Sequence, residues 1–451
     1  MGKFFGTDGV RGVANRELTC ELAIKIGKAA AKVLTENTHH RAKILIGKDT
    51  RISSDMLESA LLSGICSLGA EGISLGVVPT PAVAYLVRKY NADAGIMISA
   101  SHNSYEFNGI KLFDKNGYKL PDDTEEKIEN LIIEDNFEPS SPIIGKDLGI
   151  IKKCKTAVDD YVEHISKIAS GISFGNLKIV VDCANGSASA TAEKLFKKLK
   201  INADLIFKDP NGININENCG STQLENLKNN VLTGKYDIGI AFDGDADRCL
   251  AVDENGEIMD GDAILAICAK NAQKEGKLKN NTLVATIMSN MGLKKFCKDN
   301  GIEFSETKVG DRYVLERMLK EGHSIGGEQS GHVIFLDHST TGDGELTAVK
   351  LLSVLSCSGK KASELKNEMK KYPQKSSAVL IDISQKGKIS KSKNINDYIE
   401  KITKELEGKG RIVLRESGTE PKIRIMFEHE DERKLDSLIQ EAKKVVEKNL
   451  K

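Results

Sequence analysis

The chain repeats one pattern of strand and helix signals three times, and this repetition constrains its fold more than any other feature. In each repeat a short aliphatic run leads through a turn with Gly or Ser into an amphipathic helix pattern and a further aliphatic run. The repeats open at Lys43–Gly47, Leu177–Asp182 and Thr282–Ile287, and the second continues with a predicted helix across Ser187–Lys198. Apolar runs that alternate with helices and are buried on both faces form parallel or mixed sheets covered by helices. We therefore expect three similar α/β sandwich units with mixed sheets.

The last part of the chain follows a different pattern. Its aliphatic runs are Ala378–Ile383, Gly410–Leu414 and Lys422–Phe427, with a polar helix pattern after Ile395 and a charged one from about Glu430. Strands that are not each followed by a helix favour an α+β arrangement. We expect a smaller C-terminal α+β domain.

The length of the chain sets the number of domains. A chain of 451 residues exceeds what one hydrophobic core usually organises. A functional site between domains is therefore expected. The predicted domains span residues 1–150, 151–254, 255–368 and 369–451.

Charge and composition exclude several classes of function. The chain has 65 Lys and Arg against 65 Asp and Glu, without a long block of either sign, so we expect no nucleic-acid partner. No apolar run is long enough to cross a bilayer, and the segment Met1–Gly6 lacks the apolar stretch of a signal peptide. The nine cysteines never show Cys-x-x-Cys spacing, which predicts reduced thiols. We expect a cytoplasmic protein without a membrane partner.

The most specific local signal is a run of three aspartates, Asp243, Asp245 and Asp247, followed by Arg248. Alternate carboxylates of an extended segment point to one side, and the small residues between them let three oxygens meet on one hard cation such as Mg²⁺. The alternative is a solvated acidic turn or a calcium loop. Because the run lacks the spacing and terminal Glu of an EF-hand, we favour a metal site.

A second polar run places Ser101 beside His102 and Asn103, directly after the aliphatic run Ala94–Ser99. α/β proteins bind their ligands at such strand ends. A serine carries phosphate only where its neighbours stabilise negative charge, and His102 and Asn103 can donate hydrogen bonds there. A helix cap or polar turn is the alternative. Ser101 is not within a Gly-x-Ser-x-Gly pattern, which argues against an ordinary hydrolase triad.

A third run lies between two short strands of the last domain and contains a guanidinium, two hydroxyls and a glycine. Such a turn suits a phosphate, and Arg424 can add charge. A hairpin turn with an incidental Arg is the alternative. The residues of this run are Arg415, Ser417, Gly418 and Thr419.

A glycine-rich loop, Gly326–His332, offers donors and acceptors to a polyhydroxylated ligand through Glu328 and Ser330. By itself it is equally consistent with an ordinary turn. Arg11 and Lys111 are two cations in predicted tight turns, and they indicate a functional site only in combination with the other motifs.

Taken in this order, the motifs resemble those of the α-D-phosphohexomutase family, and the match covers the whole chain. The resemblance implies four domains around a central cleft, the last of which carries a phosphate loop. It implies that Ser101 is a phosphoserine and that Asp243, Asp245 and Asp247 hold one Mg²⁺ per chain together with an oxygen of that phosphoserine.

The resemblance also implies roles for the remaining motif residues. The substrate's second phosphate and the sugar hydroxyls would be bound by Arg415, Ser417, Gly418, Thr419, Arg424, Glu328 and Ser330. The catalytic group would comprise Ser101, His102, Lys111, His332, Arg11 and Arg248. Within this group, either Lys111 or His332 would be the general acid and base.

Four segments are similar to the branch of the family that acts on glucosamine phosphates: Gly6–Gly12, Val309–Val314, Glu328–Ser330 and Arg415–Thr419. The implied reaction interconverts glucosamine 6-phosphate and glucosamine 1-phosphate, with glucosamine 1,6-bisphosphate as intermediate and primer. Such an enzyme would lie on the route to UDP-N-acetylglucosamine and cell-wall precursors. The expected partner is a small sugar phosphate, and a homodimer is the candidate assembly.

Three alternatives stay open at this point. A phosphoglucomutase or phosphomannomutase would keep the fold and change the sugar. A magnesium phosphatase with an Asp nucleophile would leave Ser101 and Arg415 without a role. A sugar-phosphate sensor without turnover would have no need for Ser101, the three aspartates and the phosphate turn together.

Overall fold

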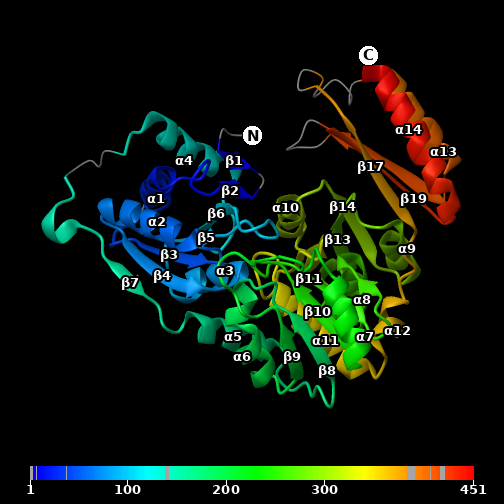
Figure 1. The fold of residues 1–451 in the computed structure, drawn as a ribbon, viewed down its shortest axis with the longest axis horizontal. Coiled ribbons are helices and arrows are strands. Elements are labelled where there is room, and N and C mark those ends of the chain that lie inside the picture. The colour runs from blue at the N-terminus through cyan, green and yellow to red at the C-terminus, as the bar shows by residue number, and fades with distance from the viewer. Residues whose placement is uncertain are drawn as a thin grey trace.

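The computed structural model describes residues 4–6, 8–36, 38–137, 142–382, 385, 392–406, 408–416 and 422–450. Four β-sheets organise these residues into four units in chain order. In Figure 1 the first unit is blue and cyan, the second and third follow in green and yellow, and the fourth is orange and red at the upper right. The architecture of three α/β units and a smaller C-terminal α+β unit is the one predicted from the sequence.

The first unit contains a seven-stranded mixed sheet in the order β1-β2-β6-β5-β3-β4-β7. The strands β5, β3, β4 and β7 are parallel, whereas β1, β2 and β6 pair antiparallel. The strands are β1 (Phe5–Gly6), β2 (Gly9–Val13), β3 (Lys43–Lys48), β4 (Glu71–Val77), β5 (Ala94–Ile98), β6 (Phe107–Asp114) and β7 (Ile151–Lys153). The helices are α1 (Cys20–Leu34), α2 (Ser54–Ser67), α3 (Thr80–Lys89) and α4 (Asp122–Glu134), followed by the 3₁₀ helix η1 (Gly145–Asp147).

The second unit contains a five-stranded mixed sheet in the order β12-β11-β10-β8-β9. Its strands are β8 (Lys178–Asp182), β9 (Asn202–Ile206), β10 (Ile238–Phe242), β11 (Cys249–Asp253) and β12 (Ile258–Met259). Its helices are α5 (Ala157–Ile168), η2 (Ser187–Ala190), α6 (Ala192–Lys198) and α7 (Glu225–Gly234).

The third unit contains a four-stranded mixed sheet in the order β14-β13-β15-β16. Its strands are β13 (Thr282–Thr286), β14 (Glu303–Thr307), β15 (Ile325–Gly327) and β16 (Val333–Phe335). Its helices are α8 (Gly261–Lys274), η3 (Lys279–Asn281), α9 (Met291–Asp299), α10 (Asp311–Glu321), α11 (Gly344–Ser358) and α12 (Ala362–Lys366).

The fourth unit contains an antiparallel sheet in the order β17-β19-β18. Its strands are β17 (Gln374–Leu380), β18 (Gly410–Glu416) and β19 (Lys422–His429). Its helices are α13 (Lys393–Glu405), η5 (Glu432–Lys434) and α14 (Leu435–Leu450).

Successive side chains of a strand point to opposite faces of its sheet, so the side chains of an aliphatic strand enter two different cores. In β3, Ile44 and Ile46 pack in a core with residues of α1, α2 and α4, whereas Leu45 faces the opposite core. That opposite core is continuous through the first three units and includes Tyr161 and Leu352. The fourth unit has a core of its own. The first three units therefore pack as one body, to which the fourth is attached.

Three element boundaries differ from the prediction. The helix predicted over 187–198 divides at Thr191 into η2 and α6. The strand predicted at Ala378–Ile383 is shifted toward the N-terminus, because Gln374 to Leu380 pair along β19. The C-terminal helix begins at Leu435 rather than near Glu430. The predicted domain limits at 150, 254 and 368 remain predictions.

Two other expectations can be compared with the structure. All nine cysteines lie within the described ranges and are unpaired thiols, as predicted. Within the part of the chain that the structure describes, no helix combines the length and apolar character needed to span a bilayer.

Candidate active site

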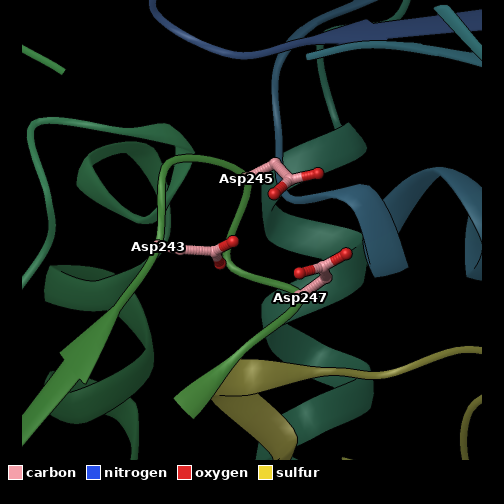
Figure 2. Close-up of side chains that lie close together, drawn as sticks. All are labelled: Asp243, Asp245 and Asp247. Atoms are coloured by element: carbon pink, nitrogen blue, oxygen red, sulfur yellow. The ribbon is translucent and has the colours of Figure 1, made fainter. Parts of the chain in front are cut away.

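The three aspartates lie in the loop between β10 and β11, and their side chains point toward one another (Figure 2). One carboxylate oxygen from each lies within 4.8 Å of the others. The loop is tight: the Ala246 N–H donates to the Asp243 carbonyl at 3.0 Å, and Ala246 has a φ of 52°. All three carboxylates are buried. The sequence spacing therefore brought three oxygens to one point, as predicted.

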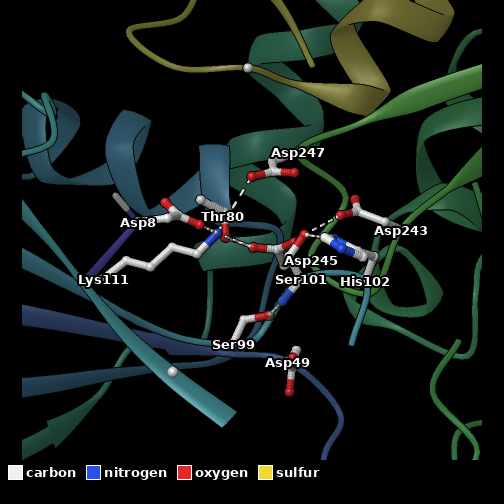
Figure 3. Close-up of polar contacts among 12 residues, drawn as sticks. Asp8, Asp49, Thr80, Ser99, Ser101, His102, Lys111, Asp243, Asp245 and Asp247 are labelled. Carbon is white, nitrogen blue, oxygen red and sulfur yellow. Dashed lines mark hydrogen bonds and ion pairs between the residues drawn. The ribbon is translucent and has the colours of Figure 1, made fainter. Parts of the chain in front are cut away.

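Ser101 reaches this loop from the first unit, directly after β5 (Figure 3). Its hydroxyl donates a hydrogen bond to Asp243 Oδ2 at 2.6 Å, and its side chain is buried. His102 Nδ1 lies 3.4 Å from the same hydroxyl. Burial, together with Arg248 and Arg11, lowers the pKa of His102 to about 4, so its ring is neutral near pH 7. The serine and the aspartate loop therefore form one site across two units.

Lys111, on β6, adds a buried cation to the aspartates. Its Nζ lies 2.8 Å from Asp245 Oδ2, 3.1 Å from Asp8 Oδ2 and 3.5 Å from Asp247 Oδ2. Although burial opposes it, the carboxylates of Asp245 and Asp8 raise the pKa of Lys111 well above its usual range. The Thr80 hydroxyl also donates to Asp245 Oδ2, at 2.5 Å. Lys111 is therefore an ammonium ion at neutral pH.

The aspartate loop is suited to a divalent cation. Within the described residues, Asp245 Oδ1 and Asp247 Oδ1 are buried without a hydrogen-bond partner. Burial, together with Asp247 and Asp245, raises the pKa of Asp243 well above its usual range. Three buried carboxylates repel one another unless a cation lies between them. An all-oxygen donor set with unsatisfied oxygens fits a hard ion such as Mg²⁺.

Two arginines predicted for the site lie at its margin. Arg248 Nε is 4.0 Å from Asp243 Oδ2 and 3.9 Å from Asp247 Oδ1, and it has no hydrogen-bond partner among the described residues. Arg11 pairs with Asp8, and 30% of its side chain is exposed. Both guanidinium groups therefore retain donors that an anionic ligand can use.

His332, from the third unit, lies on the other side of Asp247. Its Nδ1 is 3.6 Å from Asp247 Oδ2, and its Nε2 accepts the Gly342 N–H at 3.1 Å. That contact requires a lone pair on Nε2 and places a ring proton on Nδ1. Although burial opposes it, the carboxylates of Asp247 and Asp311 raise the pKa of His332. Each ring nitrogen thus contacts a protein group.

The predicted sugar loop connects β15 to β16. Glu328 Oε1 accepts the Gly310 N–H at 3.1 Å, and burial raises the pKa of Glu328. Ser330 is exposed at the tip of the loop. The Gly331 N–H donates to the Glu328 carbonyl at 3.0 Å and closes the turn. One acidic and one hydroxyl side chain are therefore held on the same short loop.

The predicted phosphate turn is described in part. Arg415 and Arg424 face each other in the β18–β19 register. Both line a cavity of about 320 Å³ that Met288 of the third unit also lines. Burial and the neighbouring Arg424 lower the pKa of Arg415, whose Nε has no hydrogen-bond partner within the described residues. Like charges this close favour an anion between them. Ser417, Gly418 and Thr419 lie outside the described residues.

The structure adds four residues that the sequence reasoning did not assign to the site. Lys119 Nζ lies 2.6 Å from Asp8 Oδ1 and 2.5 Å from Asp311 Oδ2, which joins the first unit to the third. Thr80 is the fourth, through its bond to Asp245. Asp8 and Asp311 lie within the segments Gly6–Gly12 and Val309–Val314, which the sequence analysis had identified. Thr80 and Lys119 lie in no such motif, because only the fold brings them to the aspartate loop.

Comparisons with known proteins identify the family to which the chain belongs. Four family models match in order: phosphoglucomutase/phosphomannomutase alpha/beta/alpha domain I at residues 2–139, domain II at 159–256, domain III at 260–372 and the C-terminal domain at 363–445. A phosphoglucosamine mutase from Clostridium novyi is 52% identical over 447 residues, covering 99% of each chain.

Two solved structures share the fold. A phosphoglucomutase/phosphomannomutase family protein from Burkholderia thailandensis has a TM-score of 0.82 at 23% identity, covering 98% of this chain and 96% of that one. The N-acetylphosphoglucosamine mutase of Aspergillus fumigatus, in complex with GlcNAc-6P and magnesium, has a TM-score of 0.72 at 17% identity, covering 100% of this chain and 96% of that one.

Proposed function

Because the chain belongs to the phosphoglucomutase/phosphomannomutase family, we propose that it interconverts glucosamine 6-phosphate and glucosamine 1-phosphate. The full-length similarity to phosphoglucosamine mutase supports this choice of sugar. One structural observation carries the proposal: the Ser101 hydroxyl is bonded at 2.6 Å to an aspartate of a loop suited to a cation. That arrangement fits a serine that gives and receives phosphate.

The reaction proceeds by two transfers, because the 1- and 6-positions lie at opposite ends of the sugar. In the first, the C1 hydroxyl oxygen forms a bond to the phosphorus on Ser101, and the bond from that phosphorus to Ser101 Oγ breaks. The product is glucosamine 1,6-bisphosphate. After the sugar turns end for end, Ser101 Oγ takes the phosphoryl group from C6 and leaves glucosamine 1-phosphate. Free bisphosphate primes a protein that has lost its phosphate.

Asp243, Asp245 and Asp247 would hold one Mg²⁺ per chain, which when bound supplies positive charge to offset the phosphoryl oxygens. The chain contributes further cations around the same point. Lys111 is a buried ammonium ion, and Arg248 and Arg11 keep donors available. These fixed charges favour a transition state whose negative charge is spread over several oxygens.

Each transfer also moves one proton, for which Lys111 and His332 are the two candidates. The sugar hydroxyl loses a proton in the first transfer, and the sugar oxygen regains one in the second. Lys111 holds a proton that it can donate. His332 Nε2 can accept one when the Gly342 N–H is displaced, and the carboxylates of Asp247 and Asp311, which raise the pKa of His332, stabilise the cation that forms.

Sugar recognition falls to the loop of Glu328 and Ser330. The amine of glucosamine is largely a cation at neutral pH, and Glu328 offers it an anionic partner. Burial raises the pKa of Glu328, and an approaching cation favours its ionised form. Ser330 is exposed and can bond a sugar hydroxyl. The phosphate that is not reacting is bound by Arg415, Ser417, Gly418, Thr419 and Arg424.

A comparison of three substrates tests the proposal. The protein, primed with glucose 1,6-bisphosphate in Mg²⁺, should isomerise glucosamine 6-phosphate with a kcat/KM at least about tenfold above those for glucose and mannose 6-phosphates. A preference for either neutral sugar would contradict the choice of substrate. Release of inorganic phosphate without an isomer would contradict a mutase. Light scattering on the same sample tests the proposed homodimer.

A further inference from the structure

Ser101 adopts a backbone conformation that its surroundings must maintain. Its φ of 54° lies in the left-handed region, although it is not a glycine. This conformation is unfavourable for a residue with a Cβ and persists where surrounding contacts over-determine it. The Ser101 N–H donates to Ser99 Oγ at 2.9 Å, which fixes one side of the residue. The carbonyl on the other side is held by two side chains that have no role in the mechanism above.

Arg51 is the first of these side chains and follows β3 in the same unit. Its Nη2 donates to the Ser101 carbonyl at 2.9 Å. Its Nη1 donates to the carbonyls of Ser104 and Phe107, further along the same loop. Its Nε donates to Asp49 Oδ2 at 2.8 Å.

The Arg51 guanidinium is closed to substrate. The side chains of Arg51 and Asp49 are both 0% exposed, and the Asp49 carboxylate balances the charge. All of the Arg51 donor atoms contact protein oxygens. In Arg11, by contrast, 30% of the side chain is exposed. Arg51 is therefore built to hold the loop rather than to bind an anion.

Asn216 is the second side chain and comes from the second unit. Its Nδ2 donates to the Ser101 carbonyl at 2.9 Å and to the Asn103 carbonyl at 3.0 Å. Its own N–H bonds the Ala184 carbonyl at 2.9 Å, so its backbone is anchored. A Cβ on Gly244 of the aspartate loop would lie 2.6 Å from the Ser101 carbonyl oxygen and 2.9 Å from Asn216 Nδ2. The carbonyl is thus fixed where the two loops meet.

We infer that Arg51 and Asn216 are positioning residues, which hold the Ser101–His102 peptide so that Ser101 Oγ stays against the aspartate loop. If the carbonyl lost its donors, Ser101 could rotate about its N–Cα bond out of the left-handed φ, and this rotation would turn its hydroxyl away from Asp243. The inference rests on the proposed function, since it concerns the step in which Ser101 gives or receives phosphate.

The expected signature is a fall in kcat without a matching rise in KM. A misplacement of about 1 Å at a reacting atom can cost about 100-fold in rate. Asn216→Asp keeps the shape of the side chain but replaces the donor with an acceptor, so it should slow transfer by about 30- to 100-fold. Asn216→Ala should slow it by about tenfold. KM for the sugar phosphate should change by less than about threefold, because neither residue touches the ligand.

Arg51→Lys is the second variant. A lysine keeps the charge opposite Asp49 but cannot reach three carbonyls with a planar fork. It should therefore slow transfer by about tenfold or more while the protein remains folded. Two matched controls are Asn229→Asp, at an exposed position of α7, and Arg317→Lys, on α10, where 42% of the arginine side chain is exposed. Both controls should transfer phosphate at the wild-type rate.

The experiment measures single-turnover phosphate transfer from glucose 1,6-bisphosphate to each variant, followed by transfer to glucosamine 6-phosphate. Rates are taken per phosphorylated chain, and Tm is measured in parallel, so that loss of folded protein is not counted as slow chemistry. Asn216→Asp within twofold of wild type, or a loss carried mainly by KM, would overturn the inference.

The two proposals can fail separately. If the wild type loads phosphate but does not isomerise glucosamine 6-phosphate, the proposed sugar is wrong, and the loading rates of the variants still decide the inference. If the wild type takes no phosphate from the bisphosphate, both proposals are overturned.

Discussion

The site around Ser101 and the arginine cavity of the last unit are built in different ways. Ser101, Lys111 and the aspartate loop belong to units that share one continuous core, and side-chain bonds cross between these units at the site. Arg415 and Arg424 belong to a unit with its own core. The difference teaches that the groups proposed to react are part of one continuous body, whereas the cavity proposed for the far phosphate belongs to a unit with a separate core.

Several side-chain hydrogen bonds join the third and fourth units. Arg411, at the start of β18, donates to Glu428 Oε2 at 2.8 Å and to the Ile287 carbonyl at 3.0 Å. Glu428 is fully buried and also accepts the Met291 N–H at 2.9 Å. Asn290 donates to the Tyr372 carbonyl at 2.9 Å. These directional bonds therefore set the position of the arginine cavity relative to the third unit.

The largest effect is expected where the reacting groups are fixed. Asp245→Asn removes one anionic oxygen of the cation site and weakens the partner of Lys111, so kcat should fall by about 1000-fold or more. KM should stay within about threefold. Wild-type protein treated with EDTA should lose activity and regain it with Mg²⁺. Full activity in EDTA, or an Asp245→Asn variant impaired only in KM, would contradict the claim that the aspartate loop acts in the chemical step.

A smaller and different effect is expected in the arginine cavity. Arg415→Met removes a guanidinium that lines the cavity with Arg424. KM for glucosamine 6-phosphate should rise by about 30-fold, and kcat should fall by less, because binding of the remote phosphate mainly holds the substrate. Steady-state kinetics separate the two constants. A loss confined to kcat would show that this region takes part in the chemistry.

A still smaller effect on activity is expected where the third and fourth units join. Arg411→Lys keeps a cation near Glu428 but loses the planar fork that also reaches Ile287. We expect kcat/KM to fall by about five- to tenfold, together with greater release of the bisphosphate into solution. Chromatography of quenched reactions measures that release. Unchanged release would indicate that the joint does not govern how the intermediate is retained.

The smallest expected effect concerns stability and belongs to the central body. Burial raises the pKa of Glu345, in the first turn of α11, to about 8. An unfolded carboxyl ionises near pH 4, so from about pH 5 to about pH 8 the folded protein holds a proton that the unfolded chain has lost. Stability therefore falls as pH rises through this window. In Glu345→Gln the fall in Tm over the window should be smaller by a few degrees.

A control for this prediction lies in the last unit. A hydrogen bond from Arg433 lowers the pKa of the partly exposed Asp431 to about 2, so its contribution to stability is present above the unfolded pKa and is lost only in acid. Asp431→Asn should leave the slope of Tm between pH 5 and pH 8 unchanged. If both variants changed the slope of Tm between pH 5 and pH 8 equally, the pH dependence of stability would not arise from Glu345 in the central body.

Motifs made of neighbouring residues could be predicted from the sequence, and contacts made by folding could not. The spacing of Asp243, Asp245 and Asp247 was enough to predict that their oxygens meet, because the geometry is local. Thr80 and Lys119 carried no signal, since each reaches the site through the packing of its unit. The three α/β units were predictable because their apolar periodicity is strong.

Element limits were less predictable where tertiary pairing decides them. The strand β17 begins at Gln374 because its residues pair with β19, although Gln374 and Lys375 are polar. The break at Thr191 has a similar origin, since its hydroxyl bonds the buried Glu345 of the third unit. These limits depend on residues far away in the chain, so the local sequence of a segment does not predict them.

The most direct test of the account is the location and fate of one phosphate. Protein incubated with glucose 1,6-bisphosphate and Mg²⁺ should gain the mass of a single phosphate, which peptide mapping should place on Ser101, and addition of glucosamine 6-phosphate should remove it as a hexosamine bisphosphate. Phosphate found on another residue, or a Ser101→Ala variant that still isomerises the sugar, would contradict the account.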